Sequence, residues 1–168
     1  HQALVRARVL VGCPRVAAGF EAIRAQVLGR LRDLDTLRAE VSEMRAKMRD
    51  NLGSKDTAAG TAANAFESSV RFDLKQDAGG IVDIEFMVQY WVLRWAHDHP
   101  GLTRHTENIQ LLEALKAEGL LEPARAELLT QAYRRYLSVE HRLKLMERGS
   151  LADPAELGDW PAKVRQIW

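Results

Sequence analysis

The stretch IVDIEFMVQYWVLRWAH, residues 81–97, is apolar on nearly every face when it is wound into a helix. A helix that is hydrophobic all round is buried by its neighbours, so this one is predicted to be the central helix of the fold. Gly79 and Gly80 precede it, and Pro100 and Gly101 follow it. These residues interrupt helices and therefore set its limits.

Helical periodicity on both sides of this stretch predicts a bundle. Upstream, Pro14 opens a helix whose predicted inward face consists of Ala17, Phe20, Ile23, Val27 and Leu31. The next segment ends at Gly53, and its apolar stripe consists of Leu34, Leu37, Val41, Met44, Met48 and Leu52. Downstream, helices are predicted over 106–118, after Pro123, from the capping residue Asp153, and from Asp159 to the end of the sequence.

One segment departs from the helical pattern. Residues 53–69 are rich in Gly, Ser, Thr, Ala and Asn and are predicted to form a flexible loop. Val70, Phe72 and Leu74 then alternate with charged residues, which predicts a short strand. Its partner is expected either in the loop or outside the chain. We therefore predict a mainly all-α fold, a single helical domain over 1–168 with a loop and short-strand insertion around 53–76.

The composition excludes several classes of function. The 168 residues contain 24 Lys plus Arg and 23 Asp plus Glu, a net charge of +1, which gives no case for nucleic-acid binding. The central apolar run contains charged residues and is too short to favour a membrane span. Cys13, the one cysteine, is expected to be a buried thiol in a reducing, cytoplasmic compartment. Because the chain starts at His1 and has no leader, we expect a segment of a larger protein.

Two candidate metal motifs have simpler explanations. Asp33 and Asp35 lie at a helix start, where carboxylates cap backbone N–H groups. His97 and His99 lie near a helix end without further ligands close in sequence. We predict no metal site from either motif.

The segment KQDAGGIVDIEF, 75–86, is the strongest candidate site. Its paired glycines permit a sharp turn or a close approach. Asp83 lies in the first turn of the central helix, and Glu85 shares a face with Gln89 although this helix has little polar surface. Buried polar groups need partners. The expected partners are a ligand or one of three side chains: Lys75, Arg94 and Arg142.

At this segment the sequence resembles the bacterial glutamine synthetase adenylyltransferases. The resemblance rests on FDLKQDAGGIVDIEFMVQYWVLRWAHDHPGLTR (72–104), TENIQLLEALKAEGLL (106–121) and YRRYLSVEHRLKL (133–145). The opening HQALVRARVLVGC (1–13) is similar to the stretch that follows the catalytic core in that family. The spacing K-x-x-x-G-G-I-x-D-I-E-F is specific.

The resemblance implies a bifunctional parent enzyme. One half transfers AMP from ATP, with Mg²⁺, to a tyrosine of glutamine synthetase, and the other removes it; glutamine and the PII signal protein regulate both. This chain resembles a helical domain of the C-terminal, adenylylating half. The catalytic Gly-Ser and carboxylates of the nucleotidyltransferase core lie upstream of it. We therefore expect the chain to lack turnover and to bind neither ATP nor Mg²⁺ by itself.

The resemblance also implies roles for individual residues. Lys75, Gly79 and Gly80 are expected to contact the nucleotide beside the core, and Asp83, Glu85, Gln89 and Arg142 to form an interface or effector site. The alternative is that these residues only brace the joint between domains.

Three functions remain open. The chain completes the active site or docks the target, it is a regulatory module that binds glutamine or PII, or it is a plain helical interaction domain. A polar cleft around 79–85 would favour the first two, and a filled, fully paired core the third. An exposed apolar face on the first helices would indicate a domain interface.

Overall fold

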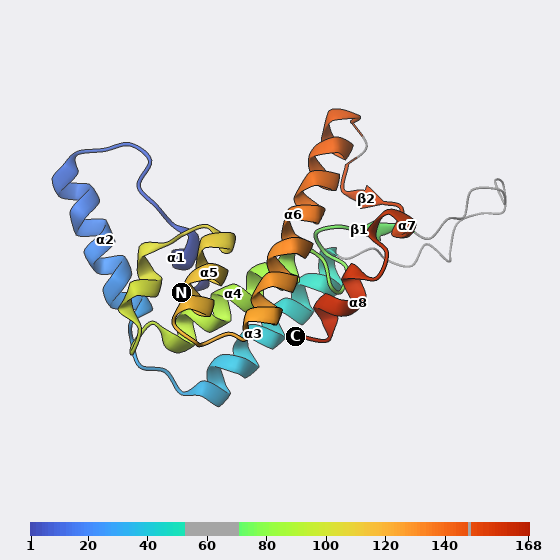
Figure 1. Cartoon of the computed structure of the whole chain (residues 1–168). Helices are drawn as coiled ribbons and strands as arrows, with labels where there is room; N and C mark the ends of the chain where they lie inside the picture. Colours follow the sequence, from blue (N-terminus) through green and yellow to red (C-terminus); the bar gives the residue numbers. More distant parts are fainter. Residues whose placement is uncertain (53–70, 148) are drawn as a thin grey trace. The chain divides into compact units, whose positions relative to one another are not determined.

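The computed structural model in Figure 1 describes residues 1–52, 71–147 and 149–168. Its helices are α1 (Gln2–Arg6), α2 (Pro14–Leu28), α3 (Leu34–Leu52), α4 (Ile81–Trp95), the 3-10 helix η1 (Pro100–Arg104), α5 (Asn108–Ala117), α6 (Pro123–Leu145), α7 (Pro154–Leu157) and α8 (Trp160–Arg165). The strands β1 (Phe72–Asp73) and β2 (Leu151–Ala152) are short. The prediction of a mainly helical fold is therefore confirmed. The predicted flexible loop, 53–69, lies outside the described residues.

The described chain groups into two compact units. The first unit comprises His1–Glu43 and Glu85–Thr130, and the second comprises Met44–Ile84 and Gln131–Trp168. No helix in the described part of the chain is long and apolar enough to cross a lipid bilayer.

In the first unit, α2 packs on α1 and η1, and α5 also packs on η1. The buried side chains of this unit are mostly aliphatic, among them Val5, Leu28, Leu37, Val88, Val92, Leu102, Leu111, Leu112 and Leu115. These residues come from α1, α2, α3, α4, η1 and α5, so the apolar periodicity of the sequence is matched by one shared core.

Arg24 is a charged residue within this core, where its side chain is only 2% exposed. Its guanidinium donates to the backbone carbonyls of Leu4, Val5, Thr103 and His105. A buried cation needs such acceptors, because an unpaired charge away from water is costly. Arg24 therefore ties α1 and the end of η1 to α2.

The inward face predicted for α2 is partly wrong. Arg24 and Leu28 are its buried residues, whereas Ile23 is 61% exposed and Leu31, beyond its end, is 78% exposed. The helix buries a narrow face centred on the Arg24 side chain, which apolar periodicity alone does not reveal. Cys13, expected to be buried, is also exposed.

In the second unit, β1 pairs antiparallel with β2, with Phe72 opposite Ala152 and Asp73 opposite Leu151. The predicted strand exists, but both partners expected from the sequence are wrong. Leu74, Ile84, Tyr136, Ala152, Leu157 and Val164 belong to the core of this unit. At the start of α7, the Asp153 carboxylate accepts the Ala155 N–H, as the sequence predicts.

Candidate functional site

The turn before α4 is closed by its own hydrogen bonds. The carboxylate of Asp73 accepts the N–H groups of Lys75 and Gln76, and the carboxylate of Asp77 accepts the N–H of Asp73. Aspartates stabilise turns in this way because the short side chain reaches nearby backbone donors. The turn thereby directs the chain from β1 into α4.

Gly79 and Gly80 are required by close packing. Gly79 adopts φ +85°, and a Cβ there would overlap the backbone of Pro161 in α8. A Cβ at Gly80 would lie 2.6 Å from the carbonyl oxygen of Leu74. Because only glycine tolerates both the positive φ and the missing space, any side chain at Gly79 would force this turn away from α8.

The backbone polar groups of the glycines have partners within the second unit. The Gly79 N–H donates to Asp83 Oδ2 at 2.5 Å, and the Gly80 N–H donates to the carbonyl of Asp77. The hydroxyl of Tyr136 donates to the Gly79 carbonyl at 2.9 Å. Burial raises the pKa of Tyr136 above its ordinary value, so the hydroxyl remains a donor at neutral pH.

Asp83 forms a buried ion pair with Arg45 of α3. The Nε of Arg45 lies 2.5 Å from Asp83 Oδ1, and both side chains are 1% exposed. Arg49, which is 36% exposed, also contacts Oδ1 at 3.3 Å. The remaining Asp83 oxygen accepts the Gly79 N–H, so this carboxylate joins α3, the glycine turn and the start of α4.

A second carboxylate of this unit also has two cationic partners. Glu140 is 6% exposed and lies 3.1 Å from the Lys75 ammonium and 2.9 Å from that of Lys144. Burial by itself would raise the pKa of Glu140, but the hydrogen bonds and charges of Lys144 and Lys75 outweigh it and lower the pKa. Lys75 keeps a 45% exposed side chain.

Glu85 and Gln89 belong to the first unit. The Glu85 carboxylate lies 2.7 Å from Nη1 of Arg6 and accepts the Asn108 side-chain amide at 3.4 Å. Gln89 is half-buried one turn further along α4. The acidic residue on the apolar helix therefore has partners from α1 and α5.

Arg142, the remaining predicted site residue, lies in the second unit, where it contacts the Glu156 carboxylate. Its side chain is 53% exposed. Of the predicted set, Lys75, Gly79, Gly80, Asp83 and Arg142 thus lie in the second unit, and Glu85 and Gln89 in the first.

The arginines that pair with Asp83 and Glu85 were not predicted from the sequence. Apolar periodicity placed Met44 on the inward stripe of α3, but Met44 is 52% exposed and the adjacent Arg45 is fully buried. Arg45 follows Leu37 and Val41 at helical spacing, so its position on the buried face was a usable signal. A buried aspartate at the start of an apolar helix was the second signal, because it requires a cation.

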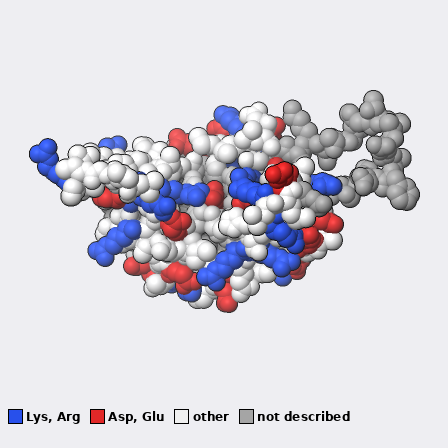
Figure 2. Space-filling model, turned by 90° about the horizontal axis from the view of Figure 1, so that it is seen from above, with Lys and Arg blue, Asp and Glu red and all other residues white. Residues whose placement is uncertain are grey.

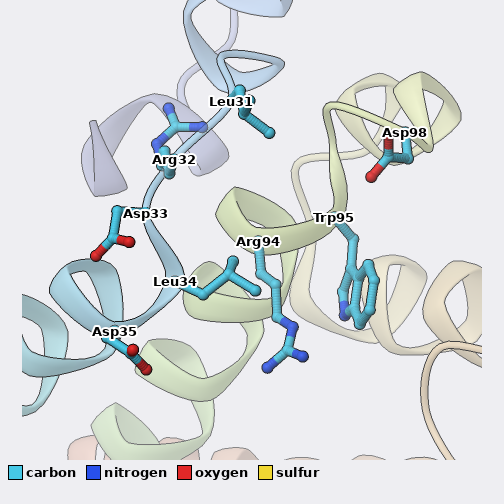
Figure 3. Close-up of a pocket in the computed structure, with 8 residues that line it drawn as sticks. All are labelled: Leu31, Arg32, Asp33, Leu34, Asp35, Arg94, Trp95 and Asp98. Carbon is cyan, nitrogen blue, oxygen red and sulfur yellow. The ribbon is translucent and has the colours of Figure 1, made fainter.

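A separate pocket of about 620 Å³ lies in the first unit (Figure 3). It is lined by Leu31, Arg32, Asp33, Leu34, Asp35, Arg94, Trp95 and Asp98. The Arg94 guanidinium lies 4.6 Å from the centroid of the Trp95 ring, a cation–π contact. Arg32 donates to the backbone carbonyls of Val27 and Leu28. The pocket therefore offers both charge signs beside an indole ring.

Among the residues of the weaker motifs, Asp33 caps a helix start as expected. Asp33 Oδ1 accepts the Thr36 N–H at 2.9 Å, and the hydrogen bonds from Thr36 lower the pKa of this exposed carboxyl. His97 bonds to the Gly29 carbonyl and His99 to Glu118. Among the described residues, no group of three or more His, Cys, Asp and Glu is placed to hold a metal ion.

The comparisons with known proteins place this chain in a family of nucleotidyltransferases. A family model described as GlnD PII-uridylyltransferase matches residues 42–150, more than half of the chain. Bifunctional glutamine synthetase adenylyltransferase/adenylyl-removing enzymes are 60% identical in Pseudomonas putida and Pseudomonas syringae pv. tomato, and 58% identical in Pseudomonas aeruginosa. Each match covers 100% of this chain and 17% of the relative. The chain therefore belongs to the GlnD PII-uridylyltransferase family, and its resemblance to the glutamine synthetase adenylyltransferases is confirmed over its full length.

Proposed function

We propose that this chain is the helical domain of an enzyme that transfers AMP between ATP and glutamine synthetase, in its C-terminal, adenylylating half. The observation that supports this best is the 60% identity over all 168 residues to the bifunctional enzyme of Pseudomonas putida. The chain spans 17% of that relative, so the nucleotidyltransferase core with its ATP and Mg²⁺ belongs to the rest of the polypeptide. Such an enzyme acts in the cytoplasm, where an exposed single thiol such as Cys13 stays reduced.

Of the three residues predicted to contact the nucleotide, only Lys75 has a geometry that suits this role. The amides of Gly79 and Gly80 donate within the chain, and backbone fills the space beside both glycines, so neither forms a phosphate cradle here. Lys75 has a half-exposed ammonium and is the one member of the three with a group that a phosphate could approach. We therefore propose that Gly79 and Gly80 shape the turn and that Lys75 alone faces the nucleotide.

The predicted interface residues fit a bracing role. Asp83 and Glu85 are each paired with arginines of this chain, a filled arrangement that the sequence analysis associated with an interaction domain. The exposed apolar side chains of the first unit favour a different interpretation, in which the chain is one domain of a larger enzyme. We propose that both interpretations are correct. The carboxylates of Asp83 and Glu85 stabilise this helical domain, and the helical domain supports the nucleotidyltransferase core.

Labelled nucleotides test the transfer reaction. The complete gene product is incubated with Mg²⁺, ATP labelled at the α-phosphate and glutamine synthetase, and in parallel with labelled UTP and PII protein. Label on glutamine synthetase from ATP is the expected result. Label on PII from UTP would replace the proposed reaction with the one that the family description names. The 168-residue chain serves as the control that should transfer neither label.

Glu85→Gln in the complete gene product tests the bracing role. Loss of the Arg6 ion pair is expected to lower both thermal stability and adenylylation, because the end of α1 loses its contact with α4. Glu156→Gln is the control, since it removes an exposed ion pair with Arg142. Unchanged stability together with unchanged adenylylation in the Glu85 variant would remove this residue from the site.

The pocket in Figure 3 favours a second candidate, a regulatory module. Its lining includes Arg94, Asp35 and Asp98, and an amino-acid zwitterion needs both a cation and a carboxylate. Glutamine is the effector that the resemblance implies, and the PII protein would act through the same module. Calorimetric titration of the chain with glutamine tests the regulatory module. A saturable binding heat that disappears in Asp98→Asn supports glutamine binding in this pocket, and the absence of a binding heat with the unaltered chain rejects it.

A further inference from the structure

One buried carboxylate of the second unit brings two lysine ammonium groups together. Glu140 of α6 is 6% exposed, and its Oε1 lies 3.1 Å from Nζ of Lys75 and 2.9 Å from Nζ of Lys144. Both distances end on the same oxygen, so the two ammonium groups lie close to each other. Lys75 comes from the turn before α4, and Lys144 from the last turn of α6. Their side chains are 45% and 58% exposed, so both remain open to solvent.

Two other lysines of the described chain form ordinary surface pairs and provide the comparison. Lys116 pairs with Glu113, and Lys163 pairs with Asp159. Each of these carboxylates is largely exposed and lies three or four residues from its lysine, so helical spacing alone accounts for the contact. Such pairs contribute little to stability. Glu140 differs because it is buried and because it joins lysines from two separate elements.

Stability is a poor explanation for this arrangement. Burying a carboxylate costs about as much as its attraction to a cation returns, and an apolar side chain would serve the core equally well. Two ammonium groups at short range also repel each other. Glu140 offsets this repulsion and restricts two flexible side chains, whose ordering costs entropy. Asp73 and Asp77, the acidic residues of the same turn, accept backbone N–H groups. Lys75 and Lys144 therefore form a preorganised, solvent-accessible cation pair.

The rest of the surface does not supply a general attraction for anions. In the view of Figure 2, Lys and Arg side chains are interspersed with Asp and Glu, in keeping with the net charge of +1. An anion that binds at the lysine pair must therefore be recognised locally. A phosphoryl group concentrates negative charge on several oxygens, and lysine binds it as a compact point charge. Two adjacent ammonium groups suit such a group better than a single carboxylate.

We propose that Lys144 binds the same phosphoryl group of ATP as Lys75, and that Glu140 is a positioning residue for both lysines. The inference rests on the proposed function, which supplies the ATP and directs Lys75 towards it. It extends that function by two residues of α6 that the sequence did not indicate. The lysines hold the nucleotide through charge and hydrogen bonds, and no covalent step involves them.

Equilibrium binding of ATP, in the presence of Mg²⁺, to the complete gene product tests the lysine pair. Lys75→Gln and Lys144→Gln should each weaken binding roughly tenfold, since each removes a charge-assisted hydrogen bond. Lys144→Arg keeps the charge and should retain most of the affinity. Lys163→Gln is the matched control, because its side chain is 44% exposed and lies in the same unit. Unchanged ATP affinity in Lys144→Gln would overturn the proposal.

Glu140→Gln separates positioning from simple charge. If the lysines acted only through their charge, loss of the neighbouring carboxylate would tighten ATP binding. Positioning predicts the opposite sign, a severalfold weaker binding and a raised KM for ATP with little change in kcat. In the Lys75→Gln, Lys144→Gln background, Glu140→Gln should weaken ATP binding no further, because there is nothing left to position. A variant that loses thermal stability but binds ATP as well as before would leave Glu140 with a purely structural role and overturn its positioning.

Two further arms identify the ligand and separate this inference from the proposed function. Orthophosphate is titrated in the same way, and a loss in Lys144→Gln that is confined to orthophosphate would overturn the assignment to ATP. Labelling of glutamine synthetase is followed in parallel. Labelling by the unaltered gene product together with normal ATP binding by Lys144→Gln refutes the lysine pair alone. Lysine-dependent ATP binding without labelling supports the lysine pair and refutes the transfer reaction.

Discussion

Replacing Asp83 with asparagine isolates the buried ion pair of the second unit. Asparagine has nearly the same volume, so the core remains filled, but the negative charge disappears. Arg45, whose side chain is 1% exposed, is then left charged with its Nε contact weakened. Arg49 and the Gly79 N–H also lose a charged acceptor.

The magnitude follows from the burial of the pair. Removing one partner of a buried ion pair costs about 3–5 kcal/mol, because the other charge stays desolvated. For a chain of this length, each kcal/mol lowers the melting temperature by roughly 2–4 °C. The expected shift for Asp83→Asn is therefore roughly 6–20 °C. Glu156→Gln, which removes a largely exposed pair with Arg142, should cost at most about 1 kcal/mol.

Denaturant unfolding of the two variants, followed by circular dichroism, measures these costs. The double variant Asp83→Asn with Arg45→Met supplies a further check, since it removes both charges and keeps a side-chain oxygen that can accept the Gly79 N–H. It should recover most of the stability lost in Asp83→Asn. A cost for Asp83→Asn below about 1 kcal/mol, or a double variant less stable than Asp83→Asn, would show that the pair is not desolvated as the geometry indicates.

Three further predictions follow from the same structure. Gly79→Ala should destabilise the chain by at least about 2 kcal/mol in urea unfolding, from its positive φ and its overlap with α8; a neutral effect would show that the turn is free to move. Because the pKa of Glu140 is lowered in the fold, its stabilisation is present above the unfolded value of 4.5 and is lost as pH falls through the lower folded value. Replacing its two lysine partners with glutamine should flatten this acid limb of the stability profile, and an unchanged limb would assign it to other carboxylates. Arg24→Met should cost about 3 kcal/mol or more, because four backbone carbonyls lose a charged donor; Arg15→Met, at an exposed position, should change the unfolding midpoint little.

Most helices were predictable because their signals are local. Periodicity and stop residues located both ends of α3 and α4, and the start of α6, within a few residues of those observed. The Asp153 cap was predicted from a local pattern, because an N-cap bond spans only two or three residues. The specific spacing of the 75–86 segment likewise identified the family without any tertiary information.

The partners of the site residues were not predictable in the same way. Arg45 was missed because apolar periodicity favours its neighbour Met44, although the buried position belongs to the arginine. The β1 strand was found, but β2 was not, because a two-residue strand has almost no pattern of its own. Its pairing is set by contacts between segments far apart in the sequence.

The sequence by itself determined that the chain is helical, where most helices begin and end, and which family it belongs to. These properties depend on hydrogen bonds within a turn of helix and on a specific string of residues. Only the tertiary structure decided that Asp83 pairs with Arg45, that Glu85 pairs with Arg6, and that Ile23 of α2 is exposed. The physical reason is that burial and charge pairing depend on which distant segments meet, and no local pattern specifies that meeting.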